Sequence, residues 1–446
     1  MDVELQILKH LARDAQSTAP VIDEYCAEYK DLFKEVRSYE CFKYLHLGII
    51  SSIKRKSLKR KSLPEIAKTV GSISAQSLHH FIANSPWSVE ELREKRLRKL
   101  LKALKGEKIT LVIDETGDRK KGKKTDYVGR QYLGSIGKVD NGIVSVNSYG
   151  IYSNTTFPLI FKVFKPKDKL KAGDNYKTKI ELAVEIIEEL INFGFQIELV
   201  LSDSLYGESS KFIRKLEKHK LDYIVAIRSN HAVWMPCEQR VRTNKWCKFE
   251  RIFSNQKPEN RYIREIIYGK RRAVTYWELT TDPETMPKNS TFLIMTNIQG
   301  NVKKVLGNLY GLRTWIEYGF RQCKQELGWT DYRFTKFKDI EKWWEIILSV
   351  FTLVSLTAEP FLSLSEQQTS QIEKKASSVD CSSHKQWDCG RGWKSNLNNI
   401  RLILQPTLVL WLIIPWLEIF PNSKLLLGLK HLISSINQCQ PFYSSG

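Results

Sequence analysis

Two aspartates follow apolar runs that are typical of buried β-strands. The run KITLVIDET contains Asp114, and the run QIELVLSD ends on Asp203. If the two strands are neighbours in one sheet, both carboxylates lie at the same edge, where they repel each other unless they share a proton or bind a cation. With no His or Cys beside them, such oxygen ligands favour Mg²⁺ or Mn²⁺ over zinc. Taken singly, each aspartate is more often a turn residue or a helix cap.

A third carboxylate, Glu317, belongs to a series of polar residues with a helical period. In NLYGLRTWIEYGFRQCKQELGW the members of the series are Tyr310, Arg313, Glu317 and Lys324, and they fall on one stripe of a straight helix. Such a stripe is a poor packing face, although a solvated helix with ion pairs has the same pattern. It suits a helix beside DNA, with the carboxylate at a metal centre and the cations at phosphates.

These residues form part of a set of motifs that resembles the bacterial insertion-sequence transposases of the DDE class. The similarity is to the group with a Tyr-x2-Arg-x3-Glu-x6-Lys signature and a β-rich insertion before the glutamate. Four features match: Asp114-Glu115-Thr116, the stretch GRQYLGSIGK at 129–138, Asp203-Ser204-Leu205-Tyr206-Gly207, and the complete series from Tyr310 to Lys324. The resemblance covers about residues 60–360.

The resemblance implies an enzyme of cut-and-paste transposition. Such an enzyme is a metal-dependent DNA endonuclease that cuts at the transposon ends, and the freed 3′-OH then attacks target DNA. The implied catalytic residues, which are also the implied ligands of two Mg²⁺ or Mn²⁺ ions, are Asp114, Asp203 and Glu317. The implied partners are double-stranded DNA, at the terminal inverted repeats and at the target, and a second copy of the chain in a synaptic homodimer.

Several further residues are candidates for contacts with DNA. The resemblance assigns the grip on the terminal phosphates to Tyr310, Arg313 and Lys324. A basic stretch after Asp114 adds Lys120, Lys121, Lys123, Lys124 and Arg130, each equally well explained as part of a solvated surface loop. In relatives an aromatic residue of the β insertion stabilises a flipped base, and the candidates here are Trp234, Trp246 and Trp277. A Trp in a sheet is more often part of the core.

Two other functions remain open at this stage. One is a transposase-derived DNA-binding regulator without catalysis, and the other is a two-metal nuclease that cuts strands without joining them. The presence of all three carboxylates speaks against the regulator.

The order of elements predicts an α/β protein with a ribonuclease-H-like mixed sheet. Three strand-like runs, with Asn141-Gly142 as a hairpin signal, precede a helix over 176–193 and an alternation of strands and helices. A Trp- and Tyr-rich alternating pattern over 230–297 predicts an inserted antiparallel β subdomain. We therefore expect the catalytic domain to comprise residues 106–229 and 298–364.

Residues 1–105 are expected to form a helical DNA-binding domain. Within it, residues 63–84 resemble a helix-turn-helix, with Gly71 at the turn and Ser72 or Ser74 as the cap of the second helix. That helix would expose Gln76, Ser77, His79 and His80 to a major groove. An ordinary helical hairpin, with a solvated basic flank at Lys54-Arg55-Lys56 and Lys59-Arg60-Lys61, explains the segment about equally well.

The composition agrees with a polyanionic partner and an intracellular location. The 446 residues include 70 Lys and Arg against 49 Asp and Glu, a net charge of +21 that is spread along the chain. The composition excludes collagen, coiled coil and disulfide miniprotein. The eight cysteines include no Cys-x-x-Cys pair, and Cys381, His384 and Cys389 lack the second pair that zinc needs. With no signal peptide legible, we expect a cytoplasmic, nucleoid-associated bacterial protein.

Residues 365–446 are expected to be a linker and a helical tail. The stretch 365–398 is rich in Ser, Gln and Lys and has no periodicity. The apolar stretch 402–420 is interrupted by Gln405, Pro406, Pro415 and Glu418, so we expect a buried helix pair and no contact with a membrane.

Overall fold

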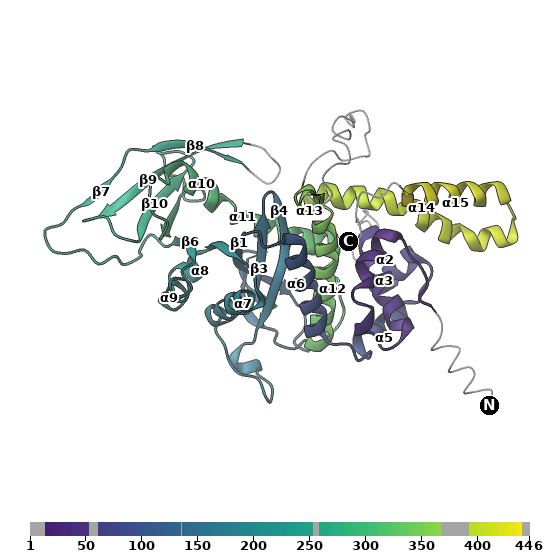
Figure 1. The fold of residues 1–446 in the computed structure, drawn as a ribbon. Coiled ribbons are helices and arrows are strands. Elements are labelled where there is room, and N and C mark those ends of the chain that lie inside the picture. Colours follow the sequence, from purple (N-terminus) through teal and green to yellow (C-terminus); the bar gives the residue numbers. More distant parts are fainter. Residues whose placement is uncertain (1–13, 53–60, 135, 253–257, 367–391, 439–446) are drawn as a thin grey trace. The chain divides into compact units, whose positions relative to one another are not determined.

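The chain folds into two compact units. The computed structural model describes residues 14–52, 61–134, 136–252, 258–366 and 392–438 (Figure 1). One unit is formed by Met1–Lys105 with Arg321–Gly446, and the other by Gly106–Phe320. Residues 321–364, which the sequence analysis assigned to the catalytic domain, therefore group with the N-terminal helices.

The unit Gly106–Phe320 is built on one mixed sheet. Its described strands are β1 (Ile109–Arg119), β2 (Gly129–Leu133), β3 (Lys138–Tyr152), β4 (Thr155–Phe164), β5 (Ile197–Ser202), β6 (Asp222–Ile227), β7 (Val241–Thr243), β8 (Cys247–Ile252), β9 (Pro258–Tyr268), β10 (Thr275–Thr280) and β11 (Phe292–Thr296). Their spatial order is β2-β3-β1-β5-β6-β11-β10-β9-β7, with β4 on β3 and β8 on β9. Strand β5 lies parallel to β1 and β6, whereas β3 is antiparallel to β1. This mixed α/β sheet is compatible with a ribonuclease-H-like core.

Helices cover this sheet. They are η2 (Lys167–Lys169), α7 (Lys179–Phe193), α8 (Ser204–Gly207), α9 (Ser210–Lys218), α10 (Lys303–Gly311) and α11 (Thr314–Arg321). Helix α7 begins at a reciprocal capping box between Thr178 and Glu181, and it buries Leu182, Ile186 and Leu190 while it packs on β3 and β4. The capping box therefore starts this helix three residues after the predicted start at 176.

The strands of residues 230–297 continue the core sheet, because β11 pairs with β6. The predicted hairpin at Asn141-Gly142 is wrong, since β3 runs through both residues and the turn lies between Leu133 and Lys138. A Cβ at Gly142 would lie 2.8 Å from the carbonyl oxygen of Asp118. The glycine therefore permits the close approach of a neighbouring strand and does not mark a turn.

The second unit is helical in its described part. Its elements are α2 (Pro20–Ala27), η1 (Lys30–Leu32), α3 (Val36–Ser51), α4 (Leu63–Val70), α5 (Ala75–Ala83), α6 (Val89–Leu104), η3 (Gln322–Leu327), α12 (Phe337–Leu356), α13 (Glu359–Glu366), α14 (Trp393–Ile419) and α15 (Ser423–Gln438). Helix α12 is buried on all sides, as expected of a central helix. Tyr25 and His46 both hydrogen-bond Ser349 of α12, and the fully buried Arg96 pairs with Glu345 at 2.6 Å.

Two helices occupy the segment that resembles a helix-turn-helix. Helices α4 and α5 are separated by Gly71, which has a φ of +75°, and Ser74 caps α5 through a bond from the Ser77 amide at 3.1 Å. Of the expected basic flank, Lys61 is buried and its ammonium donates to the carbonyl oxygen of Ile49. Residues 54–60 lie outside the described residues.

The C-terminal tail differs from the prediction. One continuous helix, α14, spans both Pro406 and Pro415, and it begins at Trp393 within the expected linker, most of which lies outside the described residues. Packing of Leu404 and Leu408 in its own unit offsets the roughly 3 kcal/mol that an internal proline costs a helix. The expected burial is also wrong: α14 is the one described helix long and apolar enough to cross a membrane, and 17% of its apolar stretch is buried.

Candidate active site

Asp114 and Asp203 lie beside each other because their strands are parallel neighbours. The parallel ladder of β1 and β5 ends with Ile113 opposite Ser202, and each aspartate is the next residue along its strand. Asp114 accepts a hydrogen bond from the Glu115 amide at 2.8 Å, and Asp203 caps α8 by accepting one from the Leu205 amide at 2.9 Å. The prediction that the two strands are neighbours is confirmed. Strand β1, however, continues to Arg119, so Asp114 lies at the end of the parallel ladder and not at the end of its strand.

The carboxyl group of Asp114 is held in an environment that disfavours its charge. The pKa of Asp114 is raised to about 7, mainly by burial; the guanidinium of Arg313 opposes this rise and the charge of Asp203 adds to it. The residue is 9% exposed. A buried acid beside a second acid is a place where an added cation gains the most Coulomb energy.

Arg313 links Asp114 to Glu317. Its guanidinium lies 3.5 Å from Oδ2 of Asp114 and 3.0 Å from Oε1 of Glu317. Burial alone would lower the pKa of Arg313, but the surrounding acidic groups outweigh it and raise that pKa above its usual value. Nε of Arg313 is buried and has no hydrogen-bond partner among the residues that the structure describes. The guanidinium therefore has a donor left for one more acceptor.

Asp114 and Glu317 share one guanidinium, and Asp203 accepts from the Leu205 amide, so the three carboxylates are not gathered into a metal-binding group. Across the described ranges, no group of three or more His, Cys, Asp and Glu side chains is arranged to hold a metal ion. Glu317 is exposed, and it accepts a hydrogen bond from the guanidinium of Arg313. Oxygen donors of this kind fit Mg²⁺ or Mn²⁺ chemically, and the buried Asp114 next to Asp203 supplies the negative charge that such an ion needs.

The predicted single helix from Tyr310 to Lys324 is wrong. Helix α10 ends at Gly311, α11 begins at Thr314, and Lys324 lies in the π-helical turn η3, which belongs to the other unit. Arg251 of β8 causes the break, because its guanidinium donates to the Gly311 carbonyl at 3.1 Å and to Thr314 Oγ1 at 2.9 Å. Of the four residues in the series, only Arg313 and Glu317 are in contact at the expected spacing of one helical turn.

Tyr310 is part of the packed wall of the site. It is 8% exposed, and its ring centroid lies 6.4 Å from that of Phe292. Burial raises the pKa of Tyr310 to about 12, with Asp203 and Asp114 adding to the rise and Arg313 opposing it. The hydroxyl is therefore protonated at neutral pH and can donate a hydrogen bond.

Two residues to which the sequence analysis assigned no role, Tyr206 and Lys179, support the segments that carry the aspartates. Tyr206 of α8 donates to Oε2 of Glu115 at 3.3 Å, and Lys179 of α7 pairs with Oε1 of Glu115 at 2.8 Å. A Cβ at Gly207 would collide with the Ala226 carbonyl oxygen, so α8 packs directly on β6. These residues lie in or near the two aspartate motifs, and they fix the segments that carry Asp114 and Asp203.

The basic residues after Asp114 lie farther from it than predicted. Because β1 continues to Arg119, Lys120 lies six residues along an extended strand, at about 20 Å from Asp114. Lys120 pairs with Asp118 at 2.7 Å. The others are exposed: Lys121, Lys123 and Lys124 in the following turn, and Arg130 on β2. They do not flank the carboxylates.

Comparison with known proteins identifies the family. Residues 39–249 match the family model described as DDE superfamily endonuclease, and residues 170–353 match the transposase DDE domain. The probable transposase for insertion sequence element IS701 of Microchaete diplosiphon is 55% identical over 330 residues, which are 74% of this chain and 86% of that protein. This chain belongs to the DDE transposases of insertion sequences. The cryo-EM structure of the piggyBac transposase synaptic complex with hairpin DNA matches 90% of the transposase and 77% of that chain, at 10% identity and a TM-score of 0.42, a similarity too low to support an argument.

The three candidate tryptophans of the transposase differ in exposure. Trp277 is 4% exposed and donates from Nε1 to Thr275 at 2.8 Å, as a core residue does. The guanidinium of Arg264 lies 4.3 Å from the ring centroid of Trp246. Trp234 is 75% exposed, and Arg272 lies 5.7 Å from its ring centroid. Only Trp234 presents most of its ring to solvent.

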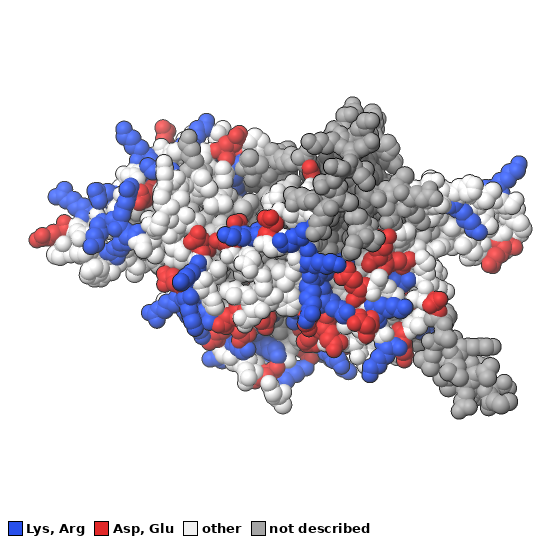
Figure 2. Space-filling view, in the orientation of Figure 1, with Lys and Arg blue, Asp and Glu red and all other residues white. Residues whose placement is uncertain are grey.

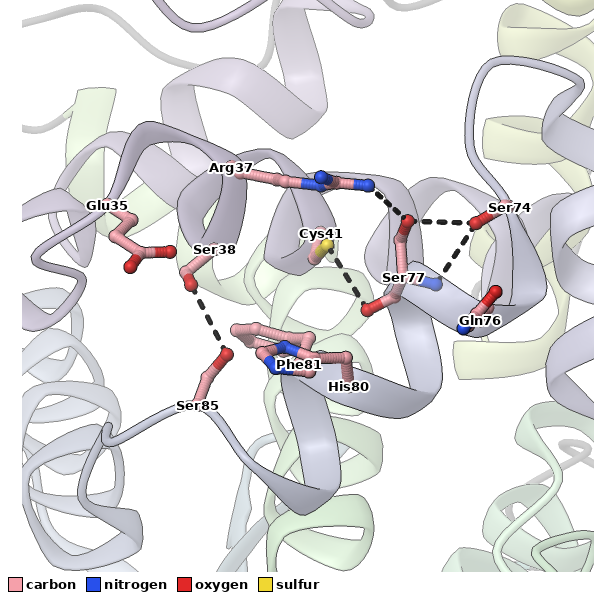
Figure 3. Close-up of a pocket in the computed structure, with 10 residues that line it drawn as sticks. All are labelled: Glu35, Arg37, Ser38, Cys41, Ser74, Gln76, Ser77, His80, Phe81 and Ser85. Carbon is pink, nitrogen blue, oxygen red and sulfur yellow. Dashed lines mark hydrogen bonds between the residues drawn. The ribbon is translucent and has the colours of Figure 1, made fainter. Parts of the chain in front are cut away.

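A polar cavity lies beside α5 of the transposase (Figure 3). Its volume is about 400 Å³, and α3 and α5 supply most of its lining. Arg37 of α3 donates to Ser77 Oγ at 2.8 Å, and Gln76 and His80 of α5 line the same cavity. Gln76, His79 and His80 are exposed and Ser77 is half-buried, whereas Leu78, Phe81 and Ile82 are buried. The sequence pattern thus predicted which side chains of α5 are buried and which face away from the core.

Proposed function

We propose that the transposase cuts DNA at the ends of its insertion sequence and joins the freed 3′-OH to target DNA, with Asp114, Asp203 and Glu317 as catalytic residues. The observation that carries this proposal is the pair of aspartates at the end of the β1–β5 ladder, of which Asp114 shares the Arg313 guanidinium with Glu317. Family membership supplies the reaction class, and the arrangement of side chains supports our choice of residues.

Divalent metal ions are general cofactors of this family, and we assign two Mg²⁺ or Mn²⁺ ions to the three carboxylates. When bound, such ions activate water and stabilise the leaving 3′ oxygen. Asp114 and Asp203 are held by backbone hydrogen bonds and would bind without rearrangement. Glu317 is exposed, so its side chain can leave Arg313 and turn to the aspartates without unpacking α11.

The released guanidinium of Arg313 then suits a DNA phosphate. Its buried Nε already has no partner in the described structure, and Arg binds phosphate through two parallel hydrogen bonds. We also assign the protonated hydroxyl of Tyr310 and the ammonium of Lys324 to contacts with DNA phosphates. Lys121, Lys123 and Lys124, about 20 Å along β1 from Asp114, would contact the duplex roughly six base pairs away.

We assign further DNA contacts to the β insertion and, separately, to the N-terminal helices. Figure 2 shows Lys and Arg side chains gathered over the β7–β10 part of the sheet. The basic residues of this stretch include the exposed Arg242, Lys270 and Arg271 and the half-buried Arg272. We assign residues 1–105 to recognition of the terminal repeats, with α5 in the major groove and Arg37 at a flanking phosphate. We expect such a transposase to act on chromosomal DNA, at the nucleoid in the cytoplasm.

The test is a strand-transfer assay. Incubation of the full-length transposase with labelled transposon ends, a target plasmid and Mg²⁺ is expected to give both cleaved ends and end–plasmid joints. Cleavage without joined product would favour a nuclease. Binding without cleavage would favour a DNA-binding regulator.

Exchange of Trp234 for Ala is expected to weaken binding of end DNA that carries an unpaired terminal base by about 10-fold or more, because a base stacked on an aromatic ring contributes roughly 1–3 kcal/mol. Affinity for fully paired duplex should not change. Fluorescence anisotropy with the two DNAs measures both values. The matched control is Trp246→Ala, since Arg264 already covers that ring. Equal losses on both DNAs would exclude stacking at Trp234.

Substitution of Gln76 and His80 together by Ala is expected to lower affinity for the terminal repeats by about 10-fold or more, because each good base contact contributes roughly 1–3 kcal/mol of discrimination. Affinity for unrelated DNA should stay the same. DNase footprinting of the full-length transposase compares the two DNAs. The control is Asn84→Ala, which changes an exposed polar residue just after the last turn of α5. An unchanged footprint in the double variant would remove α5 from recognition.

A further inference from the structure

Strand β8 of the β insertion packs closely on helix α10 at two glycines of that helix. Helix α10 lies against β8 (Figure 1), and a Cβ at Gly307 would collide with the ring of Phe249. One turn later, a Cβ at Gly311 would lie 3.0 Å from Nε of Arg251. Phe249 and Arg251 are two residues apart, so their side chains lie on the same face of the strand. The two glycines therefore let β8 reach the backbone of the helix.

The guanidinium of Arg251 binds a carbonyl group that a continuous helix would use. It donates to the Gly311 carbonyl oxygen at 3.1 Å and to Thr314 Oγ1 at 2.9 Å, and that hydroxyl donates to the same carbonyl at 2.9 Å. In an α-helix the Gly311 carbonyl would accept from the Trp315 amide. Here the Trp315 amide donates to the Leu312 carbonyl at 2.9 Å instead. Arg251 is 8% exposed, and burial of a charge is costly unless it is hydrogen-bonded, so apolar packing does not explain an arginine here.

The break between α10 and α11 is wound more tightly than an α-helix. Four amides around it donate to carbonyls three residues back, at distances of 2.9–3.3 Å: those of Leu312, Arg313, Trp315 and Ile316. Each residue of such a turn advances the chain by about 120° around the axis, against about 100° in an α-helix, so four of them rotate α11 by on the order of 80°. A straight helix would place Tyr310 and Glu317 within about 20° of each other. Instead, Tyr310 is 8% exposed and the Glu317 side chain is 57% exposed, so the break directs them to different sides.

Arg313 lies within this break and contacts two of the proposed catalytic residues. Its guanidinium lies 3.5 Å from Oδ2 of Asp114 and 3.0 Å from Oε1 of Glu317, which is in the first turn of α11. The places of both Arg313 and Glu317 therefore depend on how the chain is wound between Gly311 and Thr314. Because Arg251 binds both ends of that short segment, contacts run without interruption from β8 to the carboxylates.

We propose that Arg251 is a positioning residue of the transposase: by holding the break between α10 and α11, it sets where Arg313 and Glu317 lie relative to Asp114. Arg251 acts through the backbone and not on the reacting atoms. Strand β8 then has a role in cleavage that requires no contact with DNA. This inference rests on the proposed function, because Glu317 is a catalytic residue and a metal ligand only in that proposal.

The first test compares Arg251→Met, which keeps the apolar stem and removes the donors, with Arg251→Lys, which keeps a charged donor. Single-turnover cleavage of labelled ends by full-length Arg251→Met is expected to be about 100-fold slower than in the wild type, because a misplacement of about 1 Å can cost that much. Arg251→Lys should recover part of the rate, and affinity for end DNA should not change in either variant. The matched control is Arg261→Met, since Arg261 of the neighbouring strand β9 is also buried and pairs with Glu259 at 2.6 Å.

Binding of Mn²⁺, followed by electron paramagnetic resonance of the free ion, separates positioning from electrostatics. Loss of a positive charge near the carboxylates would by itself tighten binding of a cation, whereas displacement of Glu317 weakens it. We expect Arg251→Met to weaken Mn²⁺ binding by about 10-fold, as Glu317→Gln does. The double variant should bind no more weakly than Glu317→Gln alone, because both changes remove the same ligand. Arg261→Met should bind Mn²⁺ as the wild type does.

Thr314→Val and Thr314→Ser provide the same test if circular dichroism shows that Arg251→Met does not fold. Val removes the hydroxyl that Arg251 binds and Ser keeps it, so only Val should slow cleavage, by about 10-fold. A folded Arg251→Met or Thr314→Val that cleaves and binds Mn²⁺ as the wild type does would overturn the inference. Equal losses in Arg261→Met, or additive losses in the double variant, would overturn it too. Wild-type cleavage by Glu317→Gln would instead count against the catalytic assignment.

Discussion

Replacement of Asp114 or Asp203 by Asn, or of Glu317 by Gln, is expected to lower the rate of DNA strand cleavage by about 10³-fold or more. Each change removes one charge and one oxygen ligand from the proposed metal centre while it keeps the shape of the side chain. Binding of end DNA should be unchanged or slightly tighter, because loss of a negative charge does not weaken attraction to phosphate. Single-turnover cleavage of labelled ends in Mg²⁺ measures the rate, and filter binding measures the affinity.

The matched control for these variants is Glu198→Gln, which makes the same chemical change at an exposed position of β5, the strand that leads to Asp203. Its cleavage rate should equal that of the wild type. A site variant that cleaves at nearly the wild-type rate would remove its residue from the metal centre. If all three variants do so, the proposed active site is excluded.

The aspartate pair could be predicted from sequence because its geometry depends on neighbouring backbones. Apolar runs identify two buried strands, and parallel neighbours bring the residues after the ladder side by side, as Ile113 opposite Ser202 shows. Helix faces were predictable for the same reason: the period that separates Leu78, Phe81 and Ile82 from Gln76 and His80 is a local property. The supporting contacts of Glu115 with Tyr206 and Lys179 could not be predicted, although these residues lie in or near the motifs.

Features that depend on distant side chains could not be predicted. The break between α10 and α11 is produced by Arg251, which lies 60 residues before Gly311, so no local pattern in 310–324 reveals it. The extension of β1 to Arg119 depends on its long pairing with β3, and it moves the basic turn away from Asp114. Likewise, two prolines predicted a broken helix at 402–420, whereas burial of Leu404 and Leu408 keeps α14 continuous.

The metal-free transposase is expected to lose stability as the pH rises from about 4 to about 7. Burial and Asp203 raise the pKa of Asp114 in the folded chain to about 7 from an ordinary value of 3.8. Between these values the folded chain keeps a proton that the unfolded chain has released, so the free energy of unfolding falls with pH and is constant above the folded pKa. The full effect is on the order of 3–4 kcal/mol. Asp114→Asn removes it, so this inactive variant should be the more stable protein at pH 8.

Urea unfolding in EDTA at pH 5, 6, 7 and 8 measures this effect as the difference between wild type and Asp114→Asn, which cancels the titration of all other groups. The difference should be smallest at pH 5 and largest at pH 8. Asp118→Asn is the matched control on the same strand, because Asp118 is buried but paired with Lys120 at 2.7 Å, and its loss should destabilise the protein. Parallel pH profiles for wild type and Asp114→Asn would show that Asp114 is ionised without penalty. The site would then lack the unbalanced charge that favours a divalent ion, so the same measurement tests the electrostatic basis of the proposed metal centre.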